Sequence, residues 1–393
     1  MYDNEDVVKI IDIRKEFHMR LWPRATRFIV TSLCVVLGVA ANTHATDLNV
    51  SPFEFVTRGF IDDGVFQLET RGEIGIQLQS GFLTRSEVLL GVRSESFGKD
   101  PFDPATQVVP VIRRAAVTFE ELFGTAFSFT YFLGESDRLA SGLRFPEAFG
   151  TEPIATDFRG YLYFPDGPLY EGLFGVAGTG VRVSSGEQWR RTELSVYTYQ
   201  DNRFDPGVFS NDIAVMFNLE GVQLEAFAGA SYPLGAFGRY RGGLLANFST
   251  PEGDALLAQI GVTGFEPGTG ADFGLDDLFF LFEPRVNLGT VGLALTFFWH
   301  PGIYDQIENP ERGTIDTNLN VRIGNPFEDG VSGGLESRVS IRPESADQFL
   351  VTTGPYLRLN SGTVSWDIRA VFRPVPFDLT ELVEGYVGVR TRF

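Results

Sequence analysis

The stretch Phe66-Gln-Leu-Glu-Thr-Arg-Gly-Glu-Ile-Gly-Ile-Gln-Leu-Gln79 alternates apolar and polar side chains almost without a break. Alternation with a period of two places successive side chains on opposite faces of a β-strand. One face would carry Phe66 and Ile74, and the other would carry Glu69 and Arg71. Because no single solvent suits both faces, the stretch predicts a strand that separates an apolar from a polar environment.

The same alternation recurs along the rest of the chain, for example in residues 315–323 and 364–373. Counting every such segment predicts about eighteen strands, within a range of about 16 to 18. Residues 157–184 leave the count open, since they could hold one strand or three. The expected strands start near residues 50, 65, 82, 109, 122, 171, 189, 211, 222, 237, 255, 277, 291, 314, 331, 348, 363 and 383.

Short and long connections alternate between these strands. Residues 80–81 and 288–290 are short connections, whereas residues 96–108 and 134–170 are long ones. Outer-membrane barrels have such short periplasmic turns and longer external loops. Soluble β-sandwiches also alternate, but their strands typically run about 5 to 6 residues, and many segments here are roughly twice as long. The sequence therefore predicts an all-β fold, a transmembrane antiparallel up-and-down β-barrel.

The N-terminal residues have the pattern of an export signal. From Met19, basic residues such as Arg20 precede an apolar stretch over 28–41 and small residues that end at Ala45. This order is typical of a cleaved secretory signal. The stretch is shorter than the roughly 20 apolar residues of a spanning helix. The expected parts are a mis-assigned start extension (residues 1–18), a signal peptide (19–45) and a single outer-membrane β-barrel (46–393).

Composition excludes several classes of function. The only cysteine, Cys34, lies inside the expected signal, so the mature chain offers neither a disulfide nor a thiolate metal site. We predict no metal and no cofactor. The formal net charge of −19 makes nucleic acid an improbable partner.

The last strand supplies a separate argument. The chain ends Gly385-Tyr-Val-Gly-Val-Arg-Thr-Arg-Phe393, an alternating strand with a terminal aromatic residue. This resembles the C-terminal signature of bacterial outer-membrane β-barrel proteins. The resemblance implies that Phe393 serves as the assembly signal read by the barrel-assembly machinery. It also implies outer-membrane lipid as a partner and the bacterial outer membrane as the location.

The polar faces of the last strands are rich in arginine, and we expect them to line the lumen. Such a row of arginines could attract anions that enter a pore. The alternative is that the arginines form ion pairs that brace the wall and select nothing. The predicted pore-lining residues are Arg322, Arg338, Arg342, Arg358, Arg369, Arg373, Glu336 and Asp367.

The longest connection, residues 134–170, is the third external loop if the first strand begins near residue 50. General porins, which the arrangement resembles in topology, fold their third loop inward. The resemblance implies a constriction loop whose acids face the arginine-rich wall. The alternative is a loop that lies outside, over the mouth of the barrel. The acids that would form this constriction are Glu135, Asp137, Glu147 and Glu152.

These features predict a porin-like passive channel for small hydrophilic solutes, because about 16 to 18 strands enclose an aqueous channel. One alternative is a non-conducting structural or adhesin-type barrel that acts through its external loops. Another is an outer-membrane hydrolase, but His300 is the only histidine after the expected signal and no serine stands beside it. We therefore predict that the protein is not an enzyme. A homotrimer is an open alternative for its assembly.

Overall fold

The structure is a computed structural model, and it describes most of the chain beyond the expected signal. Residues 1–46, together with Glu152, Arg342 and Phe393, lie outside the described residues, so the expectations for them stay predictions. The described residues are 47–50, 53–62, 64–80, 84–94, 108–121, 124–151, 154, 156, 174–185, 189, 191–204, 206–234, 237–267, 273–274, 277–300, 314–325, 328–341, 348–377 and 382–391.

Strands dominate the described residues, and α2 (Phe145–Phe149) is a single turn of helix between two of them. No helix in this part of the chain is long and apolar enough to cross a membrane. The strands are β1 (Asp47–Asn49), β2 (Phe53–Asp62), β3 (Val65–Ser80), β4 (Thr84–Ser94), β5 (Val108–Phe119), β6 (Phe127–Leu139), β7 (Phe174–Ser185), β8 (Thr192–Asp201), β9 (Phe209–Leu219), β10 (Val222–Tyr232), β11 (Arg239–Ser249), β12 (Ala255–Phe265), β13 (Leu278–Leu288), β14 (Val291–His300), β15 (Thr314–Ile323), β16 (Gly330–Ile341), β17 (Phe349–Ser361), β18 (Val364–Val375) and β19 (Val383–Thr391).

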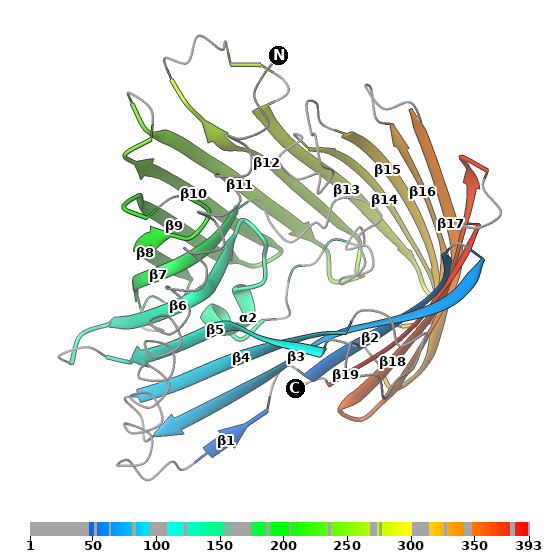
Figure 1. The fold of residues 1–393 in the computed structure, drawn as a ribbon, viewed down its shortest axis with the longest axis horizontal. Helices are drawn as coiled ribbons and strands as arrows, with labels where there is room; N and C mark the ends of the chain where they lie inside the picture. The colour runs from blue at the N-terminus through cyan, green and yellow to red at the C-terminus, as the bar shows by residue number, and fades with distance from the viewer. Residues whose placement is uncertain are drawn as a thin grey trace, which may run out of the picture.

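Each strand from β2 onward pairs antiparallel with the next one, and β19 pairs back onto β2 through Val387 and Thr57. The sheet is therefore a closed barrel of 18 strands, as the sequence predicted (Figure 1). Closure removes the open sheet edges that lipid does not tolerate. The short strand β1 also pairs with β3, directly before the start of β2.

The predicted strand starts are confirmed to within a few residues at most positions. The largest shift is at β6, expected near residue 122 and found at Phe127. Glu121 and Gly124 adopt positive φ values of 48° and 71°, which hold the chain in a turn before the strand begins. The described part of residues 157–184 holds β7 alone.

The two faces of the barrel differ as the alternation predicted. Phe66 is 60% exposed on the outer face, whereas Glu69 on the inner face of the same strand is 8% exposed. The outer face carries exposed Leu, Ile, Val and aromatic side chains on most strands, including Leu319 and Ile368. Lipid is the solvent that such a surface requires.

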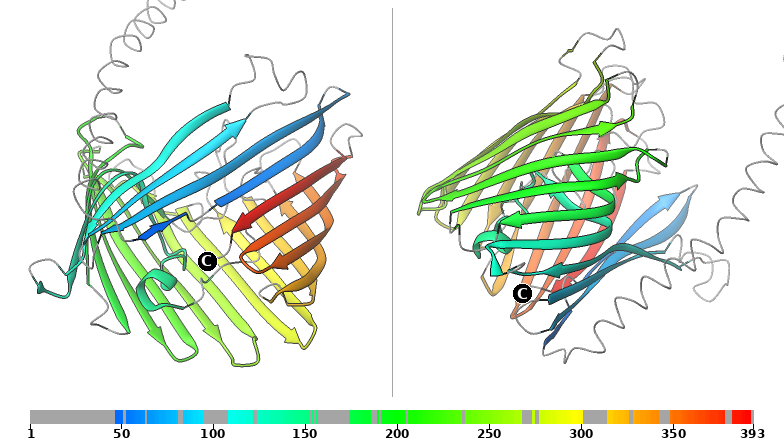
Figure 2. Two further views of the ribbon diagram at one scale, coloured as in Figure 1. Left: turned by 90° about the horizontal axis from the view of Figure 1, so that it is seen from below. Right: turned by 90° about the vertical axis from the view of Figure 1, so that its left-hand side faces the viewer.

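The described part of the connection between β6 and β7 lies inside the barrel (Figure 1, Figure 2). We call residues 140–156 the lumenal segment; residues 152, 153 and 155 within it are not described. It contains α2, which lies on the inner side of the sheet (Figure 1, Figure 2). Phe145 at the start of α2 is fully buried and packs in one apolar cluster with inward side chains of β6 to β14, such as Phe132 and Phe298.

Candidate functional site

The lumen is the candidate site, and its wall has two unlike halves. We call the inner faces of β6 to β14 the sealed half and the inner faces of β15 to β19 and β2 to β5 the open half. In the sealed half, the side chains of Arg182 and Arg241 are each 2% exposed. In the open half, Arg71, Arg113 and Arg358 keep between 20% and 26% of their side-chain surface exposed. Water therefore reaches these three arginines, as it reaches Arg285 of β13, whose side chain is 25% exposed. Asp316 of the open half is fully buried beside Arg338.

The lumenal segment covers the sealed half. α2 begins with proline at its first turn and ends at Gly150, whose φ of 66° closes the helix. Buried apolar side chains of the segment and of the wall form one cluster, which contains Ala116, Phe132, Leu139, Ala140, Phe145, Ile154, Phe174, Val176, Tyr197, Tyr199, Ala214, Met216, Phe227, Leu245, Leu257, Phe279, Leu281 and Phe298. The barrel thus has an apolar core inside its lumen.

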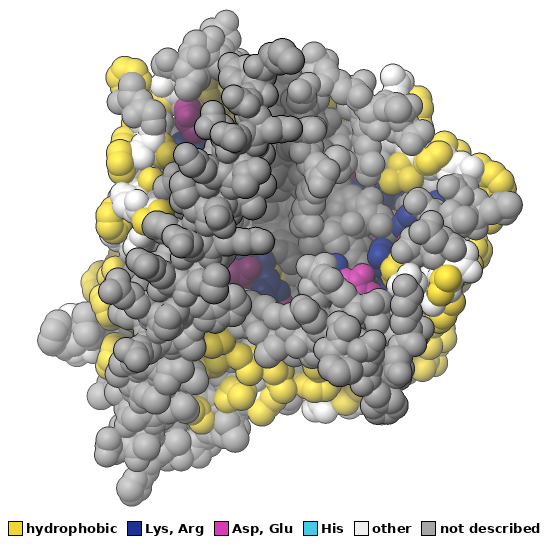
Figure 3. Space-filling model, in the orientation of Figure 1, with side chains coloured by type: hydrophobic (Ala, Val, Ile, Leu, Met, Phe, Trp, Pro, Cys, Tyr) yellow, Lys and Arg dark blue, Asp and Glu magenta, His cyan; other side chains and the backbone are white. Residues whose placement is uncertain are grey.

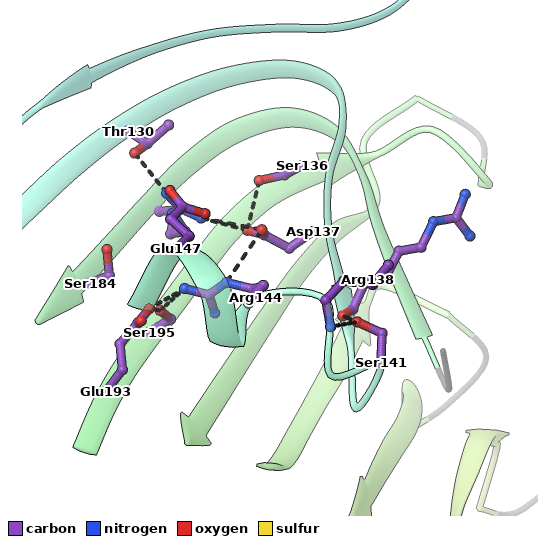
Figure 4. A network of polar contacts seen from close by, with 12 residues as sticks. Thr130, Ser136, Asp137, Arg138, Ser141, Arg144, Glu147, Ser184, Glu193 and Ser195 are labelled. Atoms are coloured by element: carbon purple, nitrogen blue, oxygen red, sulfur yellow. Dashed lines mark hydrogen bonds and ion pairs between the residues drawn. The ribbon is translucent and has the colours of Figure 1, made fainter. Parts of the chain in front are cut away.

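A buried ion network ties the lumenal segment to the wall (Figure 4). Asp137 of β6 accepts a hydrogen bond from Arg182 of β7 at 2.9 Å, and the Arg144 Nε atom lies 3.4 Å from its other oxygen. Arg144 also contacts Glu193 of β8 and donates to the Tyr197 hydroxyl at 2.9 Å. Each buried charge has an opposite charge beside it, which is what a buried ion requires.

Glu147 of α2 extends the network toward the open half. Its carboxylate accepts a hydrogen bond from Arg85 of β4 at 2.5 Å and lies 3.7 Å from Arg182. Burial raises the pKa of Glu147, but the charges of Arg182, Arg85 and Arg144 outweigh burial and bring the pKa to about 2. Burial lowers the pKa of Arg144, yet its acidic neighbours and Tyr197 hold that pKa well above the usual value. The segment therefore stays ion-paired at every physiological pH.

A further contact holds the far end of the segment. Thr156 donates a hydrogen bond to the Glu283 carboxylate of β13, which also accepts one from Thr296 of β14 at 2.6 Å. Glu283 is fully buried. The segment is thus attached to the sealed half at both of its ends.

The predicted pore-lining arginines of the open half are mostly paired with carboxylates. Arg338 donates to Asp316 at 2.9 Å, and Arg373 donates to Glu384 at 2.8 Å. The Nε atom of Arg322 has no hydrogen-bond partner in the described part of the chain. This geometry favours the alternative in which ion pairs brace the wall over a free row of positive charge.

Asp367 lies at the centre of the open half between two arginines. It accepts hydrogen bonds from Arg369 at 2.6 Å and from Arg358 at 3.0 Å. Arg369 also reaches Glu336 of β16 at 3.2 Å. An acid two residues before an arginine recurs on the inner face, as in Glu69 and Arg71, which are 2.8 Å apart. Side chains at such spacing lie on the same face of a strand, which is why this pattern produces ion pairs.

The acids of the predicted constriction loop lie elsewhere than expected. The connection was expected to begin at residue 134, but β6 continues to Leu139, so Glu135 and Asp137 are strand residues. Position 134 lies inside the strand and requires a glycine, because a Cβ atom there would lie 2.1 Å from the Arg113 carbonyl oxygen, closer than any side chain tolerates. Among the described acids, only Glu147 belongs to the connection itself.

These acids also pair with a different part of the wall from the one predicted. Glu135 accepts a hydrogen bond from Arg113 of β5 at 2.7 Å, and Glu147 and Asp137 contact arginines of β4 and β7. Arg338, Arg358 and Arg373 pair instead with acids on adjacent strands, and Arg369 pairs with Asp367 on its own strand and with Glu336 two strands away. The described carboxylates therefore do not form the predicted opposition of acidic loop and arginine-rich wall.

Sequence reasoning missed several buried charged residues of the sealed half and of the lumenal segment. Arg182, Arg144, Glu193 and Glu225 were not among the predicted site residues, although each is buried within the barrel. A signal was present, because the inward positions of β8 carry Glu193 and Tyr197. A charge next to a large aromatic residue on a lumenal face indicates that something covers that face.

A closed antiparallel barrel of 18 strands with an apolar outer face and a charged lumen is the fold of porin-like β-barrels. OprD from Pseudomonas aeruginosa matches the fold with a TM-score of 0.52 at 10% identity, over 90% of this chain and 96% of that one. A BenF-like porin from Pseudomonas fluorescens Pf-5 also gives 0.52 at 10% identity, over 88% of this chain and 98% of that one. A Rhodopseudomonas blastica porin variant gives 0.46 at 12% identity, over 88% and 100%.

The likeness to OprD and to the BenF-like porin shows the fold. No family model matches the chain. No curated protein matches it in sequence.

Proposed function

We propose that the protein is a passive channel for small hydrophilic solutes in the bacterial outer membrane. The observation that carries this proposal is the exposure of charged side chains that point into the lumen. Charged side chains of the open half, such as Arg71 and Arg113, remain about one quarter exposed, although they point into the barrel. Figure 3 shows a hollow at the centre of the molecule with charged side chains on its walls. A solute path between the lumenal segment and the open half accounts for both features.

The charges along this path come in close opposite pairs. Arg358, Asp367 and Arg369 alternate in sign within hydrogen-bonding distance of one another. Such a wall favours hydrated polar solutes over apolar ones. Because its charges are paired, it discriminates only weakly between anions and cations. No catalytic step is part of the proposal.

The test is single-channel recording from refolded residues 46–393 in planar lipid bilayers, with reversal potentials measured under a salt gradient. Stable conductance steps support the channel. A barrel that is folded, as judged by its heat-dependent electrophoretic mobility, but never conducts would refute it.

A non-conducting barrel is the second candidate, since the apolar core around Phe145 fills part of the lumen. It predicts no steps in the same recordings and binding of a partner to the external loops. A homotrimer, recognition by the assembly machinery and removal of the signal remain predictions, which cross-linking and N-terminal sequencing of the exported protein would check.

A further inference from the structure

A carboxylate on the far wall holds the start of the lumenal segment. Glu225 of β10 is fully buried, and its oxygens accept hydrogen bonds from the backbone N–H groups of Ala140 at 2.7 Å and Gly142 at 3.1 Å. Gln259 of β12 donates to the Ala140 carbonyl oxygen at 2.7 Å. Two side chains from strands that are distant in the sequence thus fix one turn of the backbone.

The backbone of this turn would not adopt its shape unaided. Ala140 has a φ of 49°, a left-handed conformation that costs a residue with a Cβ atom free energy. Gly142 has a φ of 74°, and a Cβ atom there would lie 2.5 Å from Ile154. Alternate N–H groups in such a turn point to one side and form a concave anion site, which here is filled by the Glu225 carboxylate.

The turn determines where the rest of the segment lies. Leu143, directly after it, is 39% exposed, whereas Arg144 next in the chain is buried in the ion network. A change in the turn would therefore move the exposed edge of the segment relative to the open half. Gln259 and Ser141 also contact this turn, and Gly142 accepts a hydrogen bond from the Ile154 N–H group at 3.3 Å. The ion pairs and hydrogen bonds of Arg144, Glu147 and Thr156 hold the segment further along.

We propose that Glu225 is a positioning residue that sets the width of the solute path by fixing the turn at Ala140 to Gly142. The proposal rests on the proposed channel function. Glu225 does not line the path, since it is fully buried. It acts through the lumenal segment, whose edge borders the open half.

The test follows the segment directly with a spin label. Because the expected mature chain has no cysteine, Leu143→Cys gives a single labelling site. Glu225→Gln replaces one acceptor oxygen by an N–H donor that faces another donor. We expect the mobile fraction of the label to rise about tenfold, the change that corresponds to losing about 1.4 kcal/mol of hydrogen bonding.

Asp212→Asn is the matched control. Asp212 is an equally buried carboxylate of the sealed half that binds Arg241 at 2.6 Å and Tyr199 at 2.9 Å and contacts no described residue of the segment. We expect it to leave the label as immobile as in the parent. If Glu225→Gln does not fold, Glu225→Asp keeps the carboxyl group, shortens the reach by one methylene group and should raise the mobile fraction by a smaller factor.

Conductance recorded on the same variants separates the two proposals. A mobile label together with altered step size or noise in the Glu225 variant alone supports the positioning role. A label that stays immobile in a folded Glu225→Gln barrel overturns it, even where the parent conducts. A parent that never conducts refutes the channel, while the label still reports whether Glu225 holds the segment.

Discussion

Replacing Asp137 with asparagine would remove the negative charge that lies between Arg182 and Arg144. The side chains of all three residues are between 2% and 6% exposed, so water cannot compensate the two remaining cations. Breaking a buried pair by removing one partner costs about 3 to 5 kcal/mol. Arg144 would still form an ion pair with Glu193. We therefore expect the free energy of unfolding to fall by about 3 kcal/mol, at the lower end of this range.

Asp367→Asn is the comparison that isolates the effect of burial. Asp367 also accepts hydrogen bonds from two arginines, Arg358 and Arg369, but these side chains are 17% to 20% exposed. Ion pairs that water screens contribute about 0 to 1 kcal/mol, so we expect a loss of that size. The two variants change the same functional group in the same way, and differ in how far water reaches it.

The assay is denaturant unfolding of the refolded barrel in lipid vesicles, followed by tryptophan fluorescence. Trp366 is 46% exposed on the outer face and would report transfer from lipid to water. The free energies of unfolding are compared between variants that have the same slope of free energy against denaturant concentration. A change in the denaturant midpoint then reports a change in stability. Equal losses for Asp137→Asn and Asp367→Asn would refute the division of the lumen into a sealed and an open half.

Three further predictions concern the lumen. Phe145→Ala should lower the free energy of unfolding by about 3 to 5 kcal/mol through the cavity it leaves in the lumenal core, as measured by the same unfolding assay. Arg369→Gln leaves Asp367 and Glu336 less compensated, so the reversal potential under a salt gradient should shift toward cations, and a shift toward anions would contradict the geometry. The pKa of Glu147, about 2, lies below the ordinary value of 4.5. The ionised Glu147 side chain therefore stabilises the folded barrel above about pH 4.5, and this stabilisation is lost as the pH falls toward 2. Glu147→Gln should make the unfolding midpoint less dependent on pH between these two values.

Much of the fold was predictable because alternation is a local property. Residues 66 to 79 identify both faces of β3 without any knowledge of its neighbours, and the same holds for β15 and β18. The boundaries were less certain where glycine occurs inside a strand. Gly134 has a φ of 86° and resembles a turn residue in the sequence, yet in β6 it makes room for a neighbouring carbonyl.

The candidate site was less predictable because its contacts join distant segments. The hydrogen bond from Arg182 to Asp137 spans 45 residues, and that from Ala140 to Glu225 spans 85. A single sequence shows which of these side chains point into the barrel, because inward positions alternate along a strand. It does not show the path of the connection that packs against them. The sequence analysis stated the alternative that the arginines of the open half form ion pairs. The structure adds that some of these pairs, such as Asp367 and Arg369, join residues two positions apart on one strand.

The apolar core inside the lumen leaves a trace in the sequence that can be interpreted physically. In β13, residues 278–282 are continuously apolar, and alternation is lost. Phe280 is 41% exposed on the lipid face, while Phe279 and Leu281 are fully buried on the lumenal face. A strand that is apolar on both faces needs a second apolar surface, and water in the lumen cannot supply it. Loss of alternation in a barrel strand therefore indicates that an apolar surface covers its lumenal face. In this structure Thr156 of the lumenal segment contacts Glu283 of the same strand.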